Sequence, residues 1–133
     1  MKISFAIYTF LIIFISKVVL SQESTAYDLF KNCSNYKNWI ESKFEETVDP
    51  QILFNMGKCQ GIIQTTGKMM STLCKERKRN VNINKRLAAN LEGIRTILLV
   101  KEYVRSAASI GNLQEYGAED LLTAILSKRW PCK

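Results

Sequence analysis

Four cysteines constrain the fold of this 133-residue chain more than any other feature. They are Cys33, Cys59, Cys74 and Cys132. Redox-active and zinc-binding cysteines need close spacing such as C-x-x-C, and the spacing here is far wider. We therefore expect two structural disulfides, which form and persist in an oxidising compartment.

The first residues have the three-part pattern of a secretory signal peptide. Lys2 gives a positive start, residues 3–15 are almost all apolar, and Val19 and Ser21 occupy the −3 and −1 positions of a cleavage site. A lysine interrupts the apolar run before the roughly 20 residues that a membrane-spanning helix needs. We expect residues 1–21 to be removed by cleavage after Ser21.

Residues 22–133 are then expected to form one helical domain in the periplasm or outside the cell, with no membrane segment of its own. The chain has 19 basic residues, two of them in the leader, and 12 acidic residues, so this domain carries a net charge of +5.

Apolar residues spaced three and four apart predict an all-α fold, a small bundle of four to five helices stapled by the two disulfides. Asp49 followed by Pro50 is a strong helix start, because Asp caps the first backbone N–H groups and proline suits the first helical position. The predicted helices cover residues 25–46, with a break near 33–35, then 50–73, 84–107 and 118–129.

The same spacing predicts the buried side of each helix. In chain order, these positions are Tyr27, Phe30, Tyr36, Trp39, Ile40 and Phe44; Ile52, Met56, Cys59, Ile63, Thr66, Met70 and Leu73; Leu87, Leu91, Ile94, Ile97, Leu98, Tyr103 and Val104; and Leu121, Leu122, Ile125 and Leu126.

Helix length limits how the cysteines pair. Cys59 and Cys74 lie on one predicted helix, roughly 22 Å apart at about 1.5 Å per residue, whereas a disulfide needs Cα atoms within about 7 Å. An antiparallel hairpin of the first two helices brings Cys33 within a turn of Cys59, and the last helix returns Cys132 to Cys74. We expect the pairs Cys33–Cys59 and Cys74–Cys132.

The chain contains no histidine. This excludes Ser-His-Asp and Cys-His nucleophile pairs, a histidine general base and zinc sites with histidine ligands. The carboxylates are scattered and form no recognisable acid/base pair. We therefore expect no catalytic residue, no metal site, no cofactor and no enzymatic activity.

Three segments are candidates for interaction. Gly57, Gly61 and Thr65 recur every four residues, which suits close packing of helices within the chain or, alternatively, a homodimer seam. The connection from Lys75 to Arg86 is strongly basic, which fits a solvated loop or attraction to an acidic partner. It lacks interleaved aromatic residues, so we expect no nucleic acid partner.

The connection from Ser106 to Gly117 is the best candidate for recognition, because a long loop between bundled helices is often functional. An ordinary solvated loop is the alternative. Ile110 and Leu113 are expected to anchor it. The residues expected to contact a partner are Asn112, Gln114, Glu115 and Tyr116.

Several short motifs occur in one order along the chain. They are Cys59-Gln-Gly-Ile-Ile, Leu73-Cys74, Val81-Asn-Ile, Val100-Lys-Glu-Tyr-Val, Leu121-Leu-Thr-Ala-Ile-Leu and the ending Trp130-Pro-Cys. With the leader and the four cysteines, this order resembles the Rap/Tai family of periplasmic immunity proteins, which protect bacteria against cell-wall amidases delivered by type VI secretion systems. The likeness covers residues 33–132. It departs from the family's pattern at Gln114–Ala118, which lack the usual His and Pro.

The resemblance implies a small disulfide-bonded helical domain, often a homodimer, that covers the active-site cleft of a peptidoglycan amidase. A secreted helical carrier of an apolar ligand is the alternative, although such carriers usually place their last two cysteines close together. A secreted enzyme with a carboxylate-based site is the third interpretation.

Overall fold

The computed structural model describes residues 24–43, 47–79 and 82–133; the expected leader and its cleavage site lie outside these residues. Within them the chain forms four α-helices, two short 3₁₀ helices and no strand, which confirms the all-α prediction. The elements are α2 (Ala26–Glu41), α3 (Pro50–Arg77), η1 (Lys85–Leu87), α4 (Thr96–Ala107), η2 (Leu113–Glu115) and α5 (Ala118–Arg129).

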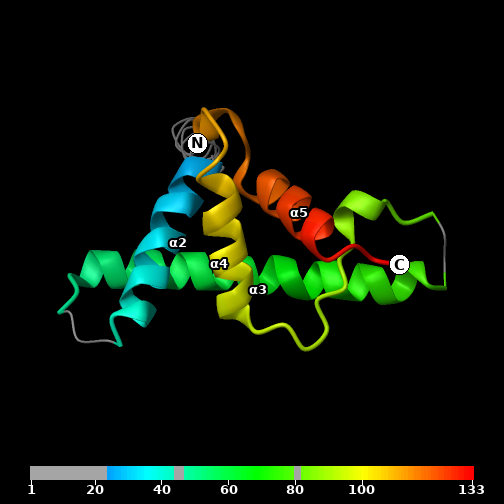
Figure 1. Ribbon diagram of the computed structural model, residues 1–133, viewed down its shortest axis with the longest axis horizontal. Helices are drawn as coiled ribbons and strands as arrows, with labels where there is room; N and C mark the ends of the chain where they lie inside the picture. Colours follow the sequence, from blue (N-terminus) through cyan, green and yellow to red (C-terminus); the bar gives the residue numbers. More distant parts are fainter. Residues whose placement is uncertain (1–23, 44–46, 80–81) are drawn as a thin grey trace, which may run out of the picture.

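The long helix α3 forms the base of the molecule (Figure 1). α2 and α4 stand side by side across its first half, and α5 lies along its second half, so that the C-terminus ends near the end of α3. The expected antiparallel hairpin is therefore wrong: α2 crosses α3 steeply. The crossing arises because α2 packs against α4 and α5 as well as against α3.

The start of α3 was predicted correctly. The Asp49 carboxylate accepts a hydrogen bond from the backbone N–H of Gln51 at 2.7 Å, and Pro50 occupies the first helical position. The helix continues a full turn past the predicted end, to Arg77, where basic side chains complement the negative end of the helix dipole. Ile52 was expected to be buried but is exposed.

α2 is continuous through residues 33–35, where a break was predicted. It begins with a reciprocal capping box between Thr25 and Asp28 and ends at Glu41, earlier than predicted. Burial of Cys33 against the core outweighs the weak helix propensity of the Ser and Asn that follow it. The chain leaves the helix through Lys43, whose φ of 55° lies in the left-handed region.

The single helix predicted over residues 84–107 is wrong. After η1 the chain is extended at Ala88, makes a turn closed by the Ile94 N–H donating to the Leu91 carbonyl at 3.1 Å, and becomes helical only at Thr96. The backbone N–H of Ala89 donates to the carbonyl of Met70 on α3 at 3.3 Å, and Gly93 has a φ of 75° that stops helix continuation. Tertiary pairing with α3 thus replaces helical hydrogen bonds. Two residues of the predicted buried side, Leu87 and Leu98, are exposed as a result.

α5 has the predicted bounds, and its four predicted apolar residues are buried. They join a core contributed by every α-helix. The largest fully buried side chains are Tyr103, Leu29, Ile63, Met70, Leu122, Leu126 and Val100.

Both expected disulfides are present. Cys33–Cys59 joins α2 to α3 with Cα atoms 5.1 Å apart, and Cys74–Cys132 joins the last turns of α3 to the C-terminal segment at 5.5 Å. The two bonds close loops of different length, with sequence separations of 26 and 58 residues.

Tyr103 ties α4 to the start of α2. Its side chain is fully buried, and its hydroxyl donates to the carbonyl of Ala26 at 3.0 Å. Burial raises the pKa of the Tyr103 hydroxyl above its ordinary value.

Removing either disulfide is predicted to destabilise the domain strongly. By loop entropy, Cys33→Ala/Cys59→Ala should lower the free energy of unfolding by about 3.5 kcal/mol and Cys74→Ala/Cys132→Ala by about 4 kcal/mol. Urea denaturation at 25 °C measures both, with Ser109→Ala as an exposed control. Losses below about 1 kcal/mol would mean that the bonds are not structural.

Tyr103 is predicted to make stability fall at high pH. Its pKa is higher in the folded protein than in the unfolded chain, so its contribution is complete below about pH 10 and is lost as the pH rises further. Tyr103→Phe should cost about 1 kcal/mol at pH 7 and flatten this fall. Urea denaturation from pH 7 to pH 11 tests it; an unchanged pH slope in the variant contradicts the assignment.

Candidate interaction site

The connection between α4 and α5 is pinned to the start of α2. The backbone N–H of Ala26 donates to the carbonyl of Tyr116 at 2.9 Å, and that of Ala118 donates to the carbonyl of Ser24 at 3.0 Å. Thr25 and Gly117 form an isolated antiparallel bridge between these bonds. The loop is therefore held at its α5 end by the backbone of another element.

Apolar side chains hold the middle of the loop, as expected. Leu113, in η2, is buried, and Ile110 packs partly buried against the core. Asn112 between them has a φ of 55°, a left-handed conformation that asparagine tolerates better than most residues. Its side-chain amide donates a hydrogen bond to the Glu115 carboxylate, and this bond within the loop stabilises its tip.

The four residues proposed for partner contact all lie exposed on this anchored loop: Asn112, Gln114, Glu115 and Tyr116. Tyr116 retains 45% of its surface accessible to solvent. We call these four residues the recognition loop. Its backbone is fixed by hydrogen bonds and buried anchors while its side chains face water, an arrangement that suits binding to another protein.

One residue beside the recognition loop was missed. Tyr27 was assigned to the buried side of its helix, but it is 44% exposed. It follows Ala26, whose N–H bonds to the loop, so a second tyrosine stands where α2 meets the recognition loop. Sequence periodicity could not find it, because only the pairing of residues 24–26 with the loop brings the two segments together.

Gly57, Gly61 and Thr65 lie on the exposed side of α3. A Cβ atom built at Gly57 or Gly61 would meet no described residue within 4 Å. The favoured interpretation, packing of helices within the chain, is therefore wrong for the residues that the structure describes. The alternative, a seam with a second copy, stays a hypothesis.

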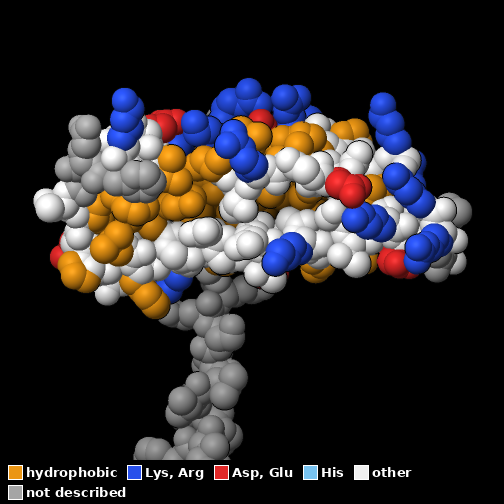
Figure 2. All heavy atoms as spheres, turned by 90° about the horizontal axis from the view of Figure 1, so that it is seen from below, with side chains coloured by type: hydrophobic (Ala, Val, Ile, Leu, Met, Phe, Trp, Pro, Cys, Tyr) orange, Lys and Arg blue, Asp and Glu red, His pale blue; other side chains and the backbone are white. Residues whose placement is uncertain are grey.

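The exposed side of α3 is apolar near its start. Leu53 and Met69 extend the row of small residues by one helical step at each end, and Phe54 beside it is 60% exposed. Figure 2 shows hydrophobic side chains gathered mainly over the half of the molecule where α3 begins, while Lys and Arg side chains are spread along its whole length. This row, Leu53-Gly57-Gly61-Thr65-Met69, is called the α3 row below.

No group of His, Cys, Asp or Glu side chains able to hold a metal ion occurs among the residues that the structure describes. In the same part of the chain, no helix combines the length and the apolar character needed to cross a membrane.

Comparisons with known proteins found no matching family model, no matching curated protein and no matching solved structure.

Gly61→Ala is predicted to stabilise the isolated domain. Glycine inside a helix costs roughly 0.5–1 kcal/mol relative to alanine, and no described atom hinders the added methyl group. Urea denaturation at low protein concentration should show a gain of this size. A loss of stability under those conditions would mean that this side of α3 packs against another part of the chain.

Proposed function

We propose that this protein is an exported immunity protein that inhibits a peptidoglycan amidase by occluding its active-site cleft. The observation that carries the proposal is the recognition loop, whose backbone is anchored while its polar and aromatic side chains stay in water. The resemblance of the cysteine framework and short motifs to the Rap/Tai family supplies the class of partner.

A pre-ordered loop suits tight inhibition. Protein association costs free energy when side chains and loops become ordered, and a loop that is already fixed avoids part of that cost. Tyr116 and Tyr27 add the side-chain type that most often dominates binding energy at interfaces.

Glu102 of α4 has polar partners on α4 and α5 that give it a structural role. Glu102 accepts a hydrogen bond from Ser106 and pairs with Arg105 at 2.5 Å and Arg129 at 3.6 Å. Burial opposes its ionisation, but these donors and cations hold the pKa of Glu102 below its usual value. A carboxylate kept ionised by two arginines is a poor general acid.

The carrier alternative receives no support from the hollow between η1 and α5. Lys85, Arg86 and Lys128 line it, and a rim of cations is costly to cover with a purely apolar ligand.

The proposal also covers the cellular compartment and the oligomeric state. Two disulfides fit an oxidising compartment such as the periplasm, where the cell-wall substrate of an amidase lies. The α3 row is a candidate seam for a homodimer, because small residues between two exposed apolar ones allow a second helix to approach closely.

The central test is a titration against the purified amidase encoded beside the gene for this protein. The variant Asn112→Ala/Glu115→Ala/Tyr116→Ala should weaken binding by well over about 2 kcal/mol, or roughly 30-fold, because it removes an aromatic contact and two polar ones. Isothermal titration calorimetry measures the affinity, and circular dichroism checks that helicity is unchanged.

The matched control is Leu87→Ala/Asn90→Ala/Glu92→Ala, which makes a similar set of exposed substitutions on another connection. It should bind like the unaltered protein. Equal affinity of all three proteins would remove the recognition loop from the interface, and no binding by the unaltered protein would refute inhibition of that amidase.

A further inference from the structure

The two disulfides differ in their access to solvent. Cys33 and Cys59 are both 0% exposed and belong to the hydrophobic core. Cys74 is 3% exposed, but Cys132 is only partly buried, and the residues on both sides of it in the chain are exposed. We call Cys33–Cys59 the inner disulfide and Cys74–Cys132 the terminal disulfide. A reagent in water therefore reaches the terminal disulfide without opening the core.

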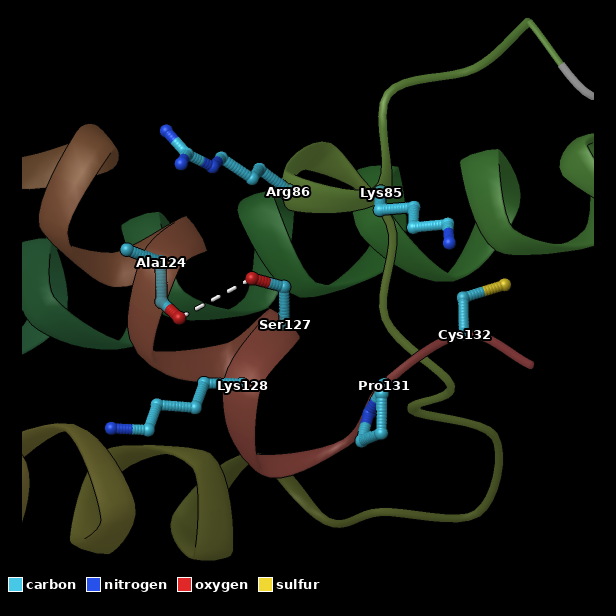
Figure 3. Close-up of a pocket in the computed structure, with 7 residues that line it drawn as sticks. All are labelled: Lys85, Arg86, Ala124, Ser127, Lys128, Pro131 and Cys132. Carbon is cyan, nitrogen blue, oxygen red and sulfur yellow. Dashed lines mark hydrogen bonds between the residues drawn. The ribbon is translucent and has the colours of Figure 1, made fainter.

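Cys132 also lines the hollow between η1, α5 and the C-terminal residues. The hollow has a volume of about 370 Å³, which gives a small molecule room beside Cys132. Figure 3 shows the Lys85 side chain and the Cys132 sulfur on one side of the hollow, whereas Arg86 and Lys128 extend toward the other side. Lys85 is thus the lining cation on the side of the terminal disulfide.

The chain beside Cys74 is strongly positive. From Lys75, which directly follows Cys74, to Arg86 there are six basic residues and one acidic residue, a net charge of +5. Glu92 pairs with Lys75 at 3.5 Å and offsets one of these charges. Positive surroundings attract anions and stabilise thiolates. They therefore favour both the approach of an anionic thiol and the departure of Cys74 as a thiolate.

The terminal disulfide holds a short backbone pairing beside the end of α3. The Asn90 N–H donates to the Trp130 carbonyl at 2.9 Å, and Ala89 and Pro131 form an isolated antiparallel bridge. The Ala89 N–H donates in turn to the carbonyl of Met70 on α3. Figure 1 places this end of the molecule apart from the start of α2, where the recognition loop is anchored. Breaking the terminal disulfide should loosen the pairing and leave the recognition loop in place.

We propose that the terminal disulfide is a thiol-exchange site, at which an anionic thiol reduces Cys74–Cys132 and releases the C-terminal residues while the inner disulfide stays intact. Exposed disulfides are the ones that exchange readily, and buried ones are protected. The proposal is independent of the amidase inhibition.

The exchange takes place in two steps. The thiolate of the first thiol attacks Cys132 Sγ and forms a mixed disulfide, while the bond to Cys74 breaks and Cys74 leaves as a thiolate that takes up a proton from water. A second thiolate attacks the sulfur of the first thiol, which releases Cys132 to be protonated in the same way and joins the two small thiols in a disulfide. The two thiols are oxidised, and the protein disulfide is reduced by two electrons.

The first measurement is the rate at which each disulfide is reduced in the folded protein. The domain is incubated with mercaptoethanesulfonate at about pH 8, near the pKa of an ordinary thiol, and quenched with acid. Alkylation and peptide mass spectrometry then identify the free thiols. Cys74 and Cys132 should be reduced at least about 100-fold faster than Cys33 and Cys59, because the buried pair reacts only when the structure opens. The first mixed disulfide should form on Cys132.

The second measurement compares an anionic thiol, mercaptoethanesulfonate, with a cationic one, cysteamine. At an ionic strength of about 0.01 M, where screening is weak, Lys85→Glu should lower the ratio of their thiolate rate constants about tenfold. Lys31→Glu makes the same charge change at an exposed position on α2 and should alter the ratio less than about twofold. A loosened structure would speed both thiols alike, so the ratio separates charge from disruption.

Amide hydrogen exchange shows what the reduction releases. After selective reduction, the protection of the Asn90 N–H should fall at least about tenfold more than that of the Ala26 N–H, which donates to the recognition loop. Cys74→Ala/Cys132→Ala should give the same pattern without a reductant. The proposal is overturned if both disulfides are reduced at one rate, if the first mixed disulfide forms on Cys74, if the two charge variants have the same ratio, or if Ala26 loses as much protection as Asn90.

Discussion

The two disulfides attach the elements on either side of the core to one helix, α3, and the rest of the structure depends on that attachment. A domain of this size has a small core and little stability to spare. Cys33–Cys59 fixes α2 near the start of α3, and Cys74–Cys132 fixes the chain end beyond α5 near its finish. α4 carries no cysteine, and Tyr103 holds it to α2 through the Ala26 carbonyl. Since α2, α4 and α5 are all held in place, the loop between α4 and α5 inherits a fixed position.

The fixed position of the recognition loop suits it to bind a partner. The loop spans from the end of α4 to the start of α5 and pairs with the residues that begin α2. A free loop of this length would sample many conformations and pay for ordering upon binding. Here the burial of Leu113 and the backbone hydrogen bonds to Ser24 and Ala26 order the loop during folding, before a partner binds. The exposed side chains therefore present one arrangement to a partner.

Local signals along the sequence predicted α3 and α5, because a cap and a periodic apolar stripe determine them within a short stretch. Helix length excluded only the pair Cys59–Cys74. The choice of Cys33–Cys59 rested on a hairpin that the structure does not form, and the pair is present because α2 crosses α3 where these two residues meet. The sequence predictions that were wrong concern features that depend on contacts between residues far apart in the chain. The non-helical course of residues 88–95 depends on Ala89 pairing with Met70 and Pro131. The helical periodicity continued across it because its Leu and Ile residues are also apolar. Tyr27 is exposed and the α3 row is unpacked because α2 crosses α3, and no local pattern encodes a crossing angle.

The recognition loop and the hollow near η1 differ in chemistry because they arise from different parts of this frame. The loop has tyrosines and amides with one acidic residue, whereas Lys85, Arg86 and Lys128 line the hollow with no carboxylate among its described lining residues. Figure 1 places the elements that carry them apart, the α4–α5 connection beside the start of α2 and η1 beside the second half of α3. Salt at physiological concentration screens exposed charges beyond about 8 Å, so the cations around the hollow have little direct electrostatic effect on the loop. The affinity of the recognition loop for a partner therefore depends on its own side chains and on the anchors that order its backbone.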